Sequence, residues 1–183
     1  MRLILLDRDG VLNEDRPDFV KGPGELVMIP GAAAAVARLN RAGLKVALCT
    51  NQSAVGRGII TLETLDRTHA RLRDELAREG GHLDAIFFCP HAPWENCECR
   101  KPKAGMLRQA LRRFGTDPAA ATLIGDALRD LQAAKSAGCS RHLVRTGNGP
   151  KTQAEGIPHD VLPVGVHDDL AAAVSVLLDG RAA

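Results

Sequence analysis

Two aspartates separated by one residue, Asp7 and Asp9, follow a short apolar run near the start of the chain and precede Gly10. The run from Leu3 to Leu6 is typical of a strand buried on both faces of a sheet, and the glycine allows the chain to turn away. In open α/β sheets, ligands bind beyond the carboxyl ends of such strands. Two carboxylates there repel each other unless a cation or a shared proton holds them. The pattern therefore predicts a magnesium-held nucleophile, Asp7, with Asp9 as its acid/base partner.

The same D-x-D-G spacing also occurs in calcium loops and in ordinary turns. A calcium loop needs further carboxylates at alternate positions and a closing glutamate, whereas Val11 and Leu12 follow here. The ordinary turn remains the alternative reading of the isolated motif.

Three more polar motifs follow predicted strands. Thr50 ends LKVALCT, Lys101 lies in RKPK, and Asp126 and Asp130 lie in GDALRD. A hydroxyl and a lysine suit phosphate oxygens, and Asp126 facing Asp7 would complete a magnesium site. Taken singly, these residues are a strand-ending threonine, a surface lysine and a helix N-cap. Their joint order is far more specific than any one of them.

A cysteine-rich stretch, CPHAPWENCECRKP at residues 89–102, carries a second candidate metal site. Cys89, His91, Cys97 and Cys99 supply three thiolates and one imidazole, a set suited to a closed tetrahedral structural zinc site. Merely buried or reactive thiols are the alternative. Because the loop has little apolar core of its own, zinc would order it and would fix the nearby Lys101.

The secondary-structure pattern alternates between short apolar runs and longer segments of helical period. Strands are expected at 3–6, 44–49, 84–88, 122–125 and 142–144, and helices at 31–42, 61–79, around 107–114, up to 137 and at the C-terminal end. Residues 11–30, 89–104 and 147–158 read as loops, followed by a short run near Val161. His69 is expected to pack in the core. The alternation predicts a doubly wound three-layer α/β/α sandwich with a mostly parallel sheet.

Length and composition limit the possible functions. The 183 residues predict one domain, 1–183, with 89–102 as a zinc-binding loop insert and no large cap domain. A formal charge of +2 and 3% aromatic residues disfavour a nucleic-acid platform. No apolar run is long enough for a membrane span or a secretory signal. We expect a cytoplasmic monomer without nucleic-acid or membrane partners.

The order D-x-D-G, T-N-Q, K-P and G-D-x-x-x-D resembles that of the haloacid dehalogenase-like phosphohydrolases over nearly the whole chain. The resemblance implies that Asp7 attacks phosphorus and forms an aspartyl-phosphate. It implies that Asp9 protonates the leaving oxygen and then activates water. Thr50 and Lys101 would hold the phosphoryl oxygens.

The same resemblance implies a metal site. Magnesium would be bound by the carboxylates of Asp7 and Asp126 and by the backbone carbonyl of Asp9. Asp130 would not bind the metal itself and would instead hold Lys101 in position.

The zinc loop makes the chain similar to the group that contains heptose-bisphosphate and histidinol-phosphate phosphatases. TNQSAVGRG at residues 50–58 is more similar to the heptose enzymes, which implies removal of the C7 phosphate. The short segment between His91 and Cys97 resembles the histidinol branch, and Ala127 stands where some heptose enzymes carry a lysine. A histidinol-phosphate phosphatase and a zinc-stapled binding module remain alternatives. The resemblance implies a small phosphorylated sugar as the substrate. The substrate-binding residues that it implies are Asp15, Asp18, Thr50, Asn51, Gln52, Ser53, Arg100 and Lys101. Arg100 is expected to bind the phosphate group that is not removed.

Overall fold

The computed structural model describes residues 2–180 and contains one six-stranded sheet in the order β3-β2-β1-β4-β5-β6. All neighbouring strands in this sheet are parallel. The strands are β1 (Leu3–Leu6), β2 (Lys45–Asn51), β3 (Ala85–Cys89), β4 (Ala121–Gly125), β5 (Ser140–Val144) and β6 (Gly165–His167). The helices are α1 (Ala32–Arg41), α2 (Leu62–Arg78), α3 (Gly105–Phe114), α4 (Leu128–Ala137), α5 (Gly149–Glu155) and α6 (Leu170–Asp179).

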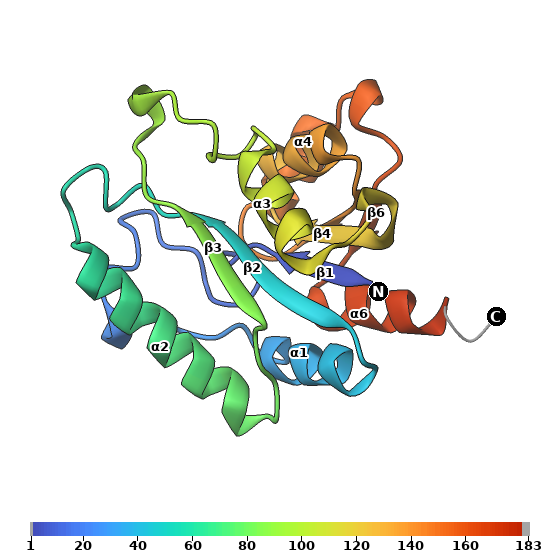
Figure 1. The fold of residues 1–183 in the computed structure, drawn as a ribbon, viewed down its shortest axis with the longest axis horizontal. Coiled ribbons are helices and arrows are strands. Elements are labelled where there is room, and N and C mark those ends of the chain that lie inside the picture. Colours follow the sequence, from blue (N-terminus) through green and yellow to red (C-terminus); the bar gives the residue numbers. More distant parts are fainter. Residues whose placement is uncertain (1, 181–183) are drawn as a thin grey trace.

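Helices cover both faces of this sheet, as the alternation of elements predicts. α1, α2 and α6 lie on one side, and α3 and α4 lie on the other (Figure 1). Side chains of β1 alternate between the two cores: Ile4 and Leu6 pack toward α1 and α6, whereas Leu3 and Leu5 pack toward α3 and α4. All four are at most 3% exposed. The predicted three-layer sandwich is therefore confirmed, and its central strand is the one that delivers Asp7.

Helix ends carry the expected local signals. The Thr61 hydroxyl accepts a hydrogen bond from the Thr64 amide at 3.1 Å and begins α2. Gly138 adopts a left-handed conformation and ends α4. His69 in α2 is 3% exposed and lies against the Phe88 ring, so it is the packed histidine that its position on the apolar stripe predicts.

Two elements differ from the prediction. The segment 147–158, expected as a loop, contains α5. Its proline lies in the first turn of the helix, where a missing backbone N–H costs no intrahelical hydrogen bond, so the proline does not prevent the helix. The run near Val161 is a 3₁₀ turn, and β6 follows it at Gly165–His167. Val161 packs with Leu131 and Leu143, so its apolar character serves the core rather than a strand.

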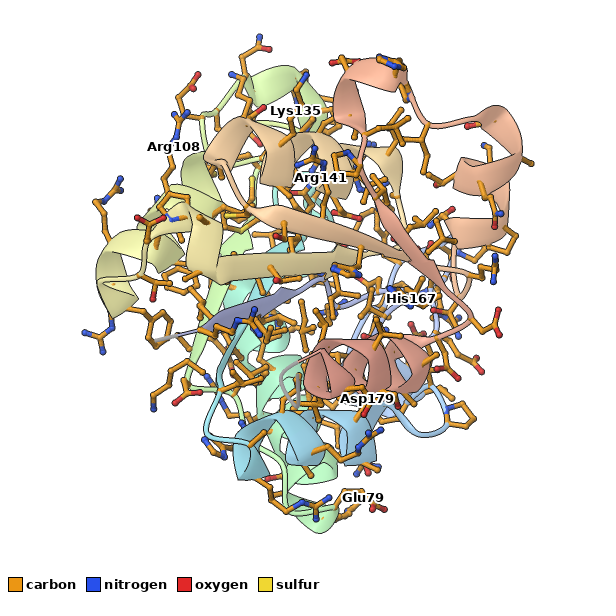
Figure 2. The ribbon with its side chains drawn as sticks, turned by 90° about the vertical axis from the view of Figure 1, so that its right-hand side faces the viewer. Glu79, Arg108, Lys135, Arg141, His167 and Asp179 are labelled. Atoms are coloured by element: carbon orange, nitrogen blue, oxygen red, sulfur yellow. The ribbon has the colours of Figure 1, made fainter. Side chains whose placement is uncertain are left out.

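The last strand lies at the edge of the sheet, between the two helical layers. Figure 2 shows His167 of β6 between Lys135 of α4 on one side and Asp179 of α6 on the other. Within residues 2–180, no helix has the length and apolar character needed to cross a membrane.

Candidate active site

Three carboxylates meet beyond the carboxyl ends of β1 and β4. Because Leu6 pairs with Ile124, the residues that follow these strands are neighbours, and the Asp7 amide donates to the Ile124 carbonyl at 3.0 Å. Carboxylate oxygens of Asp7, Asp126 and Asp130 lie within 4.8 Å of one another, and all three residues are buried. Asp7, the first aspartate of the D-x-D pair, and Asp126 of the later G-D motif thus face the same small volume.

A buried lysine ties two of these carboxylates together. Lys101 Nζ lies 3.0 Å from Asp7 Oδ2 and 2.6 Å from Asp130 Oδ1, and it donates to the Cys49 carbonyl at 2.8 Å. Lys101 is 1% exposed. The ammonium group therefore lies against two carboxylates and one carbonyl oxygen, and its contact with Asp130 is the one that the family resemblance implies.

The charges in this cluster shift one another's pKa. Burial works against the Asp7 carboxylate, but Lys101, Arg129 and hydrogen bonds to Asp7 outweigh it and hold the pKa of Asp7 below its ordinary value. Burial alone would also lower the pKa of Lys101, yet Asp130 and Asp7 raise that pKa to about 12. Burial, Asp7 and Asp130 raise the pKa of Asp126 to about 7. Asp126 therefore ionises less readily than an exposed aspartate, and a bound cation would favour its charged form.

Asp126 has one oxygen held and one oxygen left over. Its Oδ2 accepts from the Asn148 amide at 2.7 Å and from Asn148 Nδ2 at 3.1 Å. Its Oδ1 is buried and has no hydrogen-bond partner within residues 2–180. A partnerless buried carboxylate oxygen beside another carboxylate is a donor set that fits Mg²⁺, which prefers one or two protein carboxylates. Asp7 and Asp126 could therefore hold the ion.

The second aspartate of the D-x-D motif, Asp9, is not one of the three clustered carboxylates, although it lines the same cavity as Asp7. Asp9 Oδ1 accepts from Arg8 Nη2 at 2.9 Å and from Asn13 Nδ2 at 2.8 Å, and Asp9 Oδ2 accepts from Gln52 Nε2 at 2.8 Å. The Arg8 side chain is 1% exposed. The carboxylate of Asp9 is thus held by its neighbours, and the family resemblance implies that only its backbone carbonyl contacts the metal.

The loop after β2 joins this cluster to the chain segment that carries Lys101. Gln52 Nε2 donates to Thr50 Oγ1 at 3.0 Å. Asn51 Nδ2 donates to the Lys101 carbonyl at 3.0 Å, and the Lys101 amide donates back to Asn51 Oδ1 at 3.1 Å. Thr50 and Gln52 are buried. This reciprocal pair fixes the position of Lys101 relative to the end of β2.

A cavity of about 280 Å³ opens over the carboxylates. Four of the predicted substrate-binding residues line it: Asp15, Asn51, Ser53 and Arg100. Asp18 does not line it; this residue is exposed and forms ion pairs with Lys21 and, at 3.3 Å, with Arg16. Thr50, Gln52 and Lys101 lie beneath the cavity rather than on its wall.

The cavity wall also contains residues that sequence reasoning missed, among them Arg129 and Asn148. Arg129 lies in the first turn of α4, and Asn148 lies just before α5. Burial works to lower the pKa of Arg129, but the carboxylates of Asp130 and Asp7 raise it. Its position between the two aspartates of GDALRD was a usable signal for Arg129. Nothing in the local sequence marks Asn148.

The second candidate metal centre lies in the loop after β3. Sulfur and nitrogen atoms of the four predicted ligands are separated by 3.5 Å for Cys89–Cys97, 3.4 Å for Cys97–Cys99 and 3.3 Å for His91 Nδ1–Cys99. These separations are close to the edges, about 3.5–3.8 Å, of a tetrahedron with zinc–ligand bonds of 2.0–2.3 Å. They are far longer than a disulfide bond of about 2.05 Å. The donor set fits a four-ligand zinc site with no open position.

This zinc loop, residues 89–102, is bonded to the loop after β2. The Gln52 amide donates to the Cys89 carbonyl at 2.7 Å, and the Gly56 amide donates to the Pro90 carbonyl at 2.8 Å. The Arg57 guanidinium lies 4.9 Å from the centre of the Trp94 ring, within the range of a cation–π contact. Order in the zinc loop is therefore transmitted to the wall of the cavity.

Parallel strands in this order, with a carboxylate pair after the first and a G-D motif after the fourth, define a hydrolase of the haloacid dehalogenase-like class. A HAD-hydrolase-like family model matches residues 98–173. The D-glycero-beta-D-manno-heptose-1,7-bisphosphate 7-phosphatase of Bordetella bronchiseptica is 50% identical over 97% of this chain and 98% of its own length. The Pseudomonas aeruginosa protein of that name is 45% identical over 96% and 97%.

Solved structures agree with these relatives. The D,D-heptose 1,7-bisphosphate phosphatase of B. bronchiseptica, crystallised with magnesium and phosphate, matches with a TM-score of 0.94 and 49% identity over 98% of this chain and 99% of that chain. The corresponding phosphatase of Burkholderia thailandensis matches with a TM-score of 0.76 and 41% identity over 97% and 99%. The chain belongs to the D-glycero-beta-D-manno-heptose-1,7-bisphosphate 7-phosphatase family, as the resemblance of its zinc loop and of residues 50–58 implies.

Proposed function

We propose that this chain is a magnesium-dependent phosphatase that removes the C7 phosphate of D-glycero-D-manno-heptose 1,7-bisphosphate. The observation that carries the proposal is the meeting of Asp7, Asp126 and Lys101 in one buried volume beneath an open cavity. The names of its relatives support the substrate, and most of them specify the beta anomer.

Asp7 is the nucleophile in this proposal. One of its oxygens attacks phosphorus, the bond between phosphorus and the C7 oxygen breaks, and an aspartyl-phosphate forms. Lys101, 3.0 Å from Asp7 Oδ2, stabilises the carboxylate before attack and the phosphoryl oxygens afterwards. Splitting the hydrolysis in this way replaces one difficult step with two easier ones.

Asp9 moves the protons. It donates one to the departing C7 oxygen, then takes one from the water that attacks the aspartyl-phosphate and releases inorganic phosphate. In the structure its two oxygens accept hydrogen bonds from Arg8, Asn13 and Gln52. Asp9 must therefore give up at least one of these donors to present an oxygen to the leaving group.

Magnesium would be held by the carboxylates of Asp7 and Asp126 and by the Asp9 carbonyl, and it supplies charge neutralisation between the phosphate and the carboxylate nucleophile. Zinc would be held by Cys89, His91, Cys97 and Cys99, where its part is structural.

Substrate selection falls to the loops around the cavity. Asp15, Asn51 and Ser53 offer groups for sugar hydroxyls, and Arg100 offers a planar fork for the phosphate that stays. We extend the proposal to Arg129, whose positive charge faces the same cavity. Asp18 acts from the rim through its ion pair with Arg16.

We also propose that residues 1–183 act as one catalytic domain that carries the zinc loop as an insert. The net charge of +2 and the low aromatic content support small-molecule rather than nucleic-acid partners. We propose that the protein is a cytoplasmic monomer.

Phosphate release from the heptose bisphosphate and from histidinol phosphate, each with Mg²⁺ and with EDTA, tests the proposal. We expect release from the bisphosphate at least tenfold faster than from histidinol phosphate, and none with EDTA. Faster release from histidinol phosphate would overturn the substrate, and undiminished release in EDTA would overturn the metal.

A further inference from the structure

The turn after β5, formed by Thr146, Gly147 and Asn148, packs directly against the carboxylate cluster. Thr146 Oγ1 donates to the Gly10 carbonyl at 2.6 Å. A Cβ at Gly10 or at Gly147 would clash with the Asp126 carboxylate, and both glycines have positive φ, +79° and +54°. The turn, the D-x-D-G segment and Asp126 therefore fit together without free space.

Asn148 is the polar residue of this turn, and its side chain bridges two carboxylates. Its Nδ2 donates to Asp15 Oδ2 at 2.7 Å and to Asp126 Oδ2 at 3.1 Å. Both partners are acceptors, so the amino group rather than the amide oxygen must face them. Its backbone amide also donates to Asp126 Oδ2, at 2.7 Å.

All three of these hydrogen bonds are accepted by Oδ2 oxygens, and two of them fix the orientation of the Asp126 carboxylate. With its Oδ2 occupied twice, the carboxyl group cannot rotate without breaking hydrogen bonds, and its Oδ1 stays buried without a partner. Groups that fix a ligating side chain from behind commonly set metal affinity as strongly as the ligand itself.

We propose that Asn148 is a positioning residue that aims Asp126 Oδ1 at the catalytic cation and couples this carboxylate to Asp15 on the substrate loop. The inference rests on the proposed function for the identity of the ion and of the substrate. Asp15 and Asp126 repel each other, and the Asn148 amino group separates and orients both. The Asn148 side-chain amide therefore takes the same position when Asp15 binds a sugar hydroxyl and when Asp126 binds Mg²⁺.

Asn148→Ala removes the side-chain donor and leaves the backbone donor to Asp126 in place. We expect Mg²⁺ to bind 10- to 100-fold more weakly in calorimetric titrations without substrate. At saturating Mg²⁺, kcat should return to within about threefold of wild type, because no group that touches the reacting atoms is lost. KM for the bisphosphate should remain raised, because Asp15 has lost its donor.

Asn40→Ala is the matched control, because the Asn40 side-chain amide is also hydrogen-bonded, its Oδ1 accepting from the His82 backbone amide at 2.8 Å, and Asn40 does not line the cavity. It should bind Mg²⁺ as wild type does.

A double variant tests the coupling between Asp15 and Asn148. Asp15→Ala and the double variant Asp15→Ala with Asn148→Ala should have the same KM for the bisphosphate within about twofold, because the two residues act through one contact.

Mg²⁺ affinity of Asn148→Ala within twofold of wild type overturns the proposal, whatever happens to KM. Additive effects of Asp15→Ala and Asn148→Ala on KM overturn the coupling. If the alanine variant does not fold, Asn148→Ser, whose shorter side chain cannot donate to both carboxylates, takes its place with the same criteria. A wild-type protein that binds Mg²⁺ but releases no phosphate from the bisphosphate would instead count against the proposed function.

Discussion

Lys101 Nζ lies 3.0 Å from Asp7 Oδ2, and both side chains are at most 5% exposed. The second partner of the ammonium group, Asp130, is equally buried. A lysine between two buried carboxylates does more than attract phosphate: it offsets charges that would otherwise oppose folding. The catalytic centre of this chain is therefore part of its stabilising core.

Replacing this lysine should affect stability and activity together. Lys101→Met keeps the length of the side chain but leaves Asp7 and Asp130 without compensation, so we expect the free energy of unfolding to fall by about 3–5 kcal/mol. Turnover should be lost with it. Urea denaturation and phosphate release measure the two effects.

Lys103→Met is the matched control, because Lys103 forms an exposed ion pair with Glu98 at 2.8 Å. Surface pairs contribute little, so both quantities should stay close to wild type. Equal losses in the two variants would mean that burial of the Lys101 ion pair has no special importance.

Removal of the nucleophile should separate activity from folding. Asp7→Asn keeps the shape of the side chain, and Lys101 retains its contact with Asp130 at 2.6 Å. We expect turnover to fall by at least about 10³-fold, with an unchanged circular dichroism spectrum. Turnover near the wild-type rate would remove Asp7 as the attacking group.

The elements that position this chemistry could be predicted because their signals are local. β1 is a four-residue apolar run, and Asp7 and Asp126 directly follow β1 and β4. α5 was missed because Gly149 and Pro150 are typical of loops, and β6 because its three half-buried residues carry no alternation. Such short elements are decided by tertiary contacts rather than by propensity.

The site was only partly predictable for the same reason. The close spacing of the four residues between Cys89 and Cys99 that can bind zinc is visible in the sequence alone and indicates a metal site. Asn148 has a role only because the turn after β5 lies against Asp126, 22 residues earlier in the chain. Arg8 looks like a solvated residue between two aspartates, yet it is 1% exposed and bonded to Asp9. Contacts between distant segments leave no pattern in a single sequence.

Loss of zinc should disorder the cavity wall. Cys97→Ser removes one of the four ligands, so we expect the bound zinc to be lost and activity to fall by up to about 10²-fold, because Lys101 and Arg100 follow the loop directly. Trp94, the one tryptophan in the sequence, reports on this loop through its contact with Arg57. Zinc content, tryptophan emission and phosphate release should therefore change together.

Cys139→Ala is the control for this experiment, since Cys139 is buried in the core beneath α3 and α4 and is not one of the four clustered ligands. It should retain zinc and activity. Full activity of a zinc-free Cys97→Ser protein would contradict a positioning role for the metal.

His69 should make the protein sensitive to acid. Burial, followed by the positive charges of Arg8 and Arg73, lowers the pKa of His69 to about 3. The unfolded chain takes up a proton near pH 6.5, so between about pH 6.5 and 3 the unfolded state binds more protons than the folded state. Stability from this group is therefore present above pH 6.5 and falls with decreasing pH, by at most about 1.4 kcal/mol per unit.

His69→Leu should remove this contribution. Urea unfolding of both proteins between pH 4 and 8 gives two curves, and their difference cancels the other titrating groups. We expect the variant to gain relative stability as the pH falls below 6.5. A difference that does not change with pH would show that His69 is protonated in the folded protein as readily as in the unfolded chain.

Arg100 should distinguish a bisphosphate from a monophosphate. It lines the cavity and donates to the His91 carbonyl at 3.4 Å, and within residues 2–180 it forms no ion pair with a carboxylate. A guanidinium hydrogen-bonded to the retained phosphate contributes about 1.5–3 kcal/mol. Arg100→Ala should therefore raise KM for the bisphosphate roughly 10- to 100-fold and leave KM for heptose 7-phosphate nearly unchanged.

Arg16→Ala is the comparison, because Arg16 lines the same cavity but pairs with Asp18 and Glu25. This variant should weaken the binding of both substrates by the same factor. Equal losses for both substrates in Arg100→Ala would refute its assignment to the second phosphate.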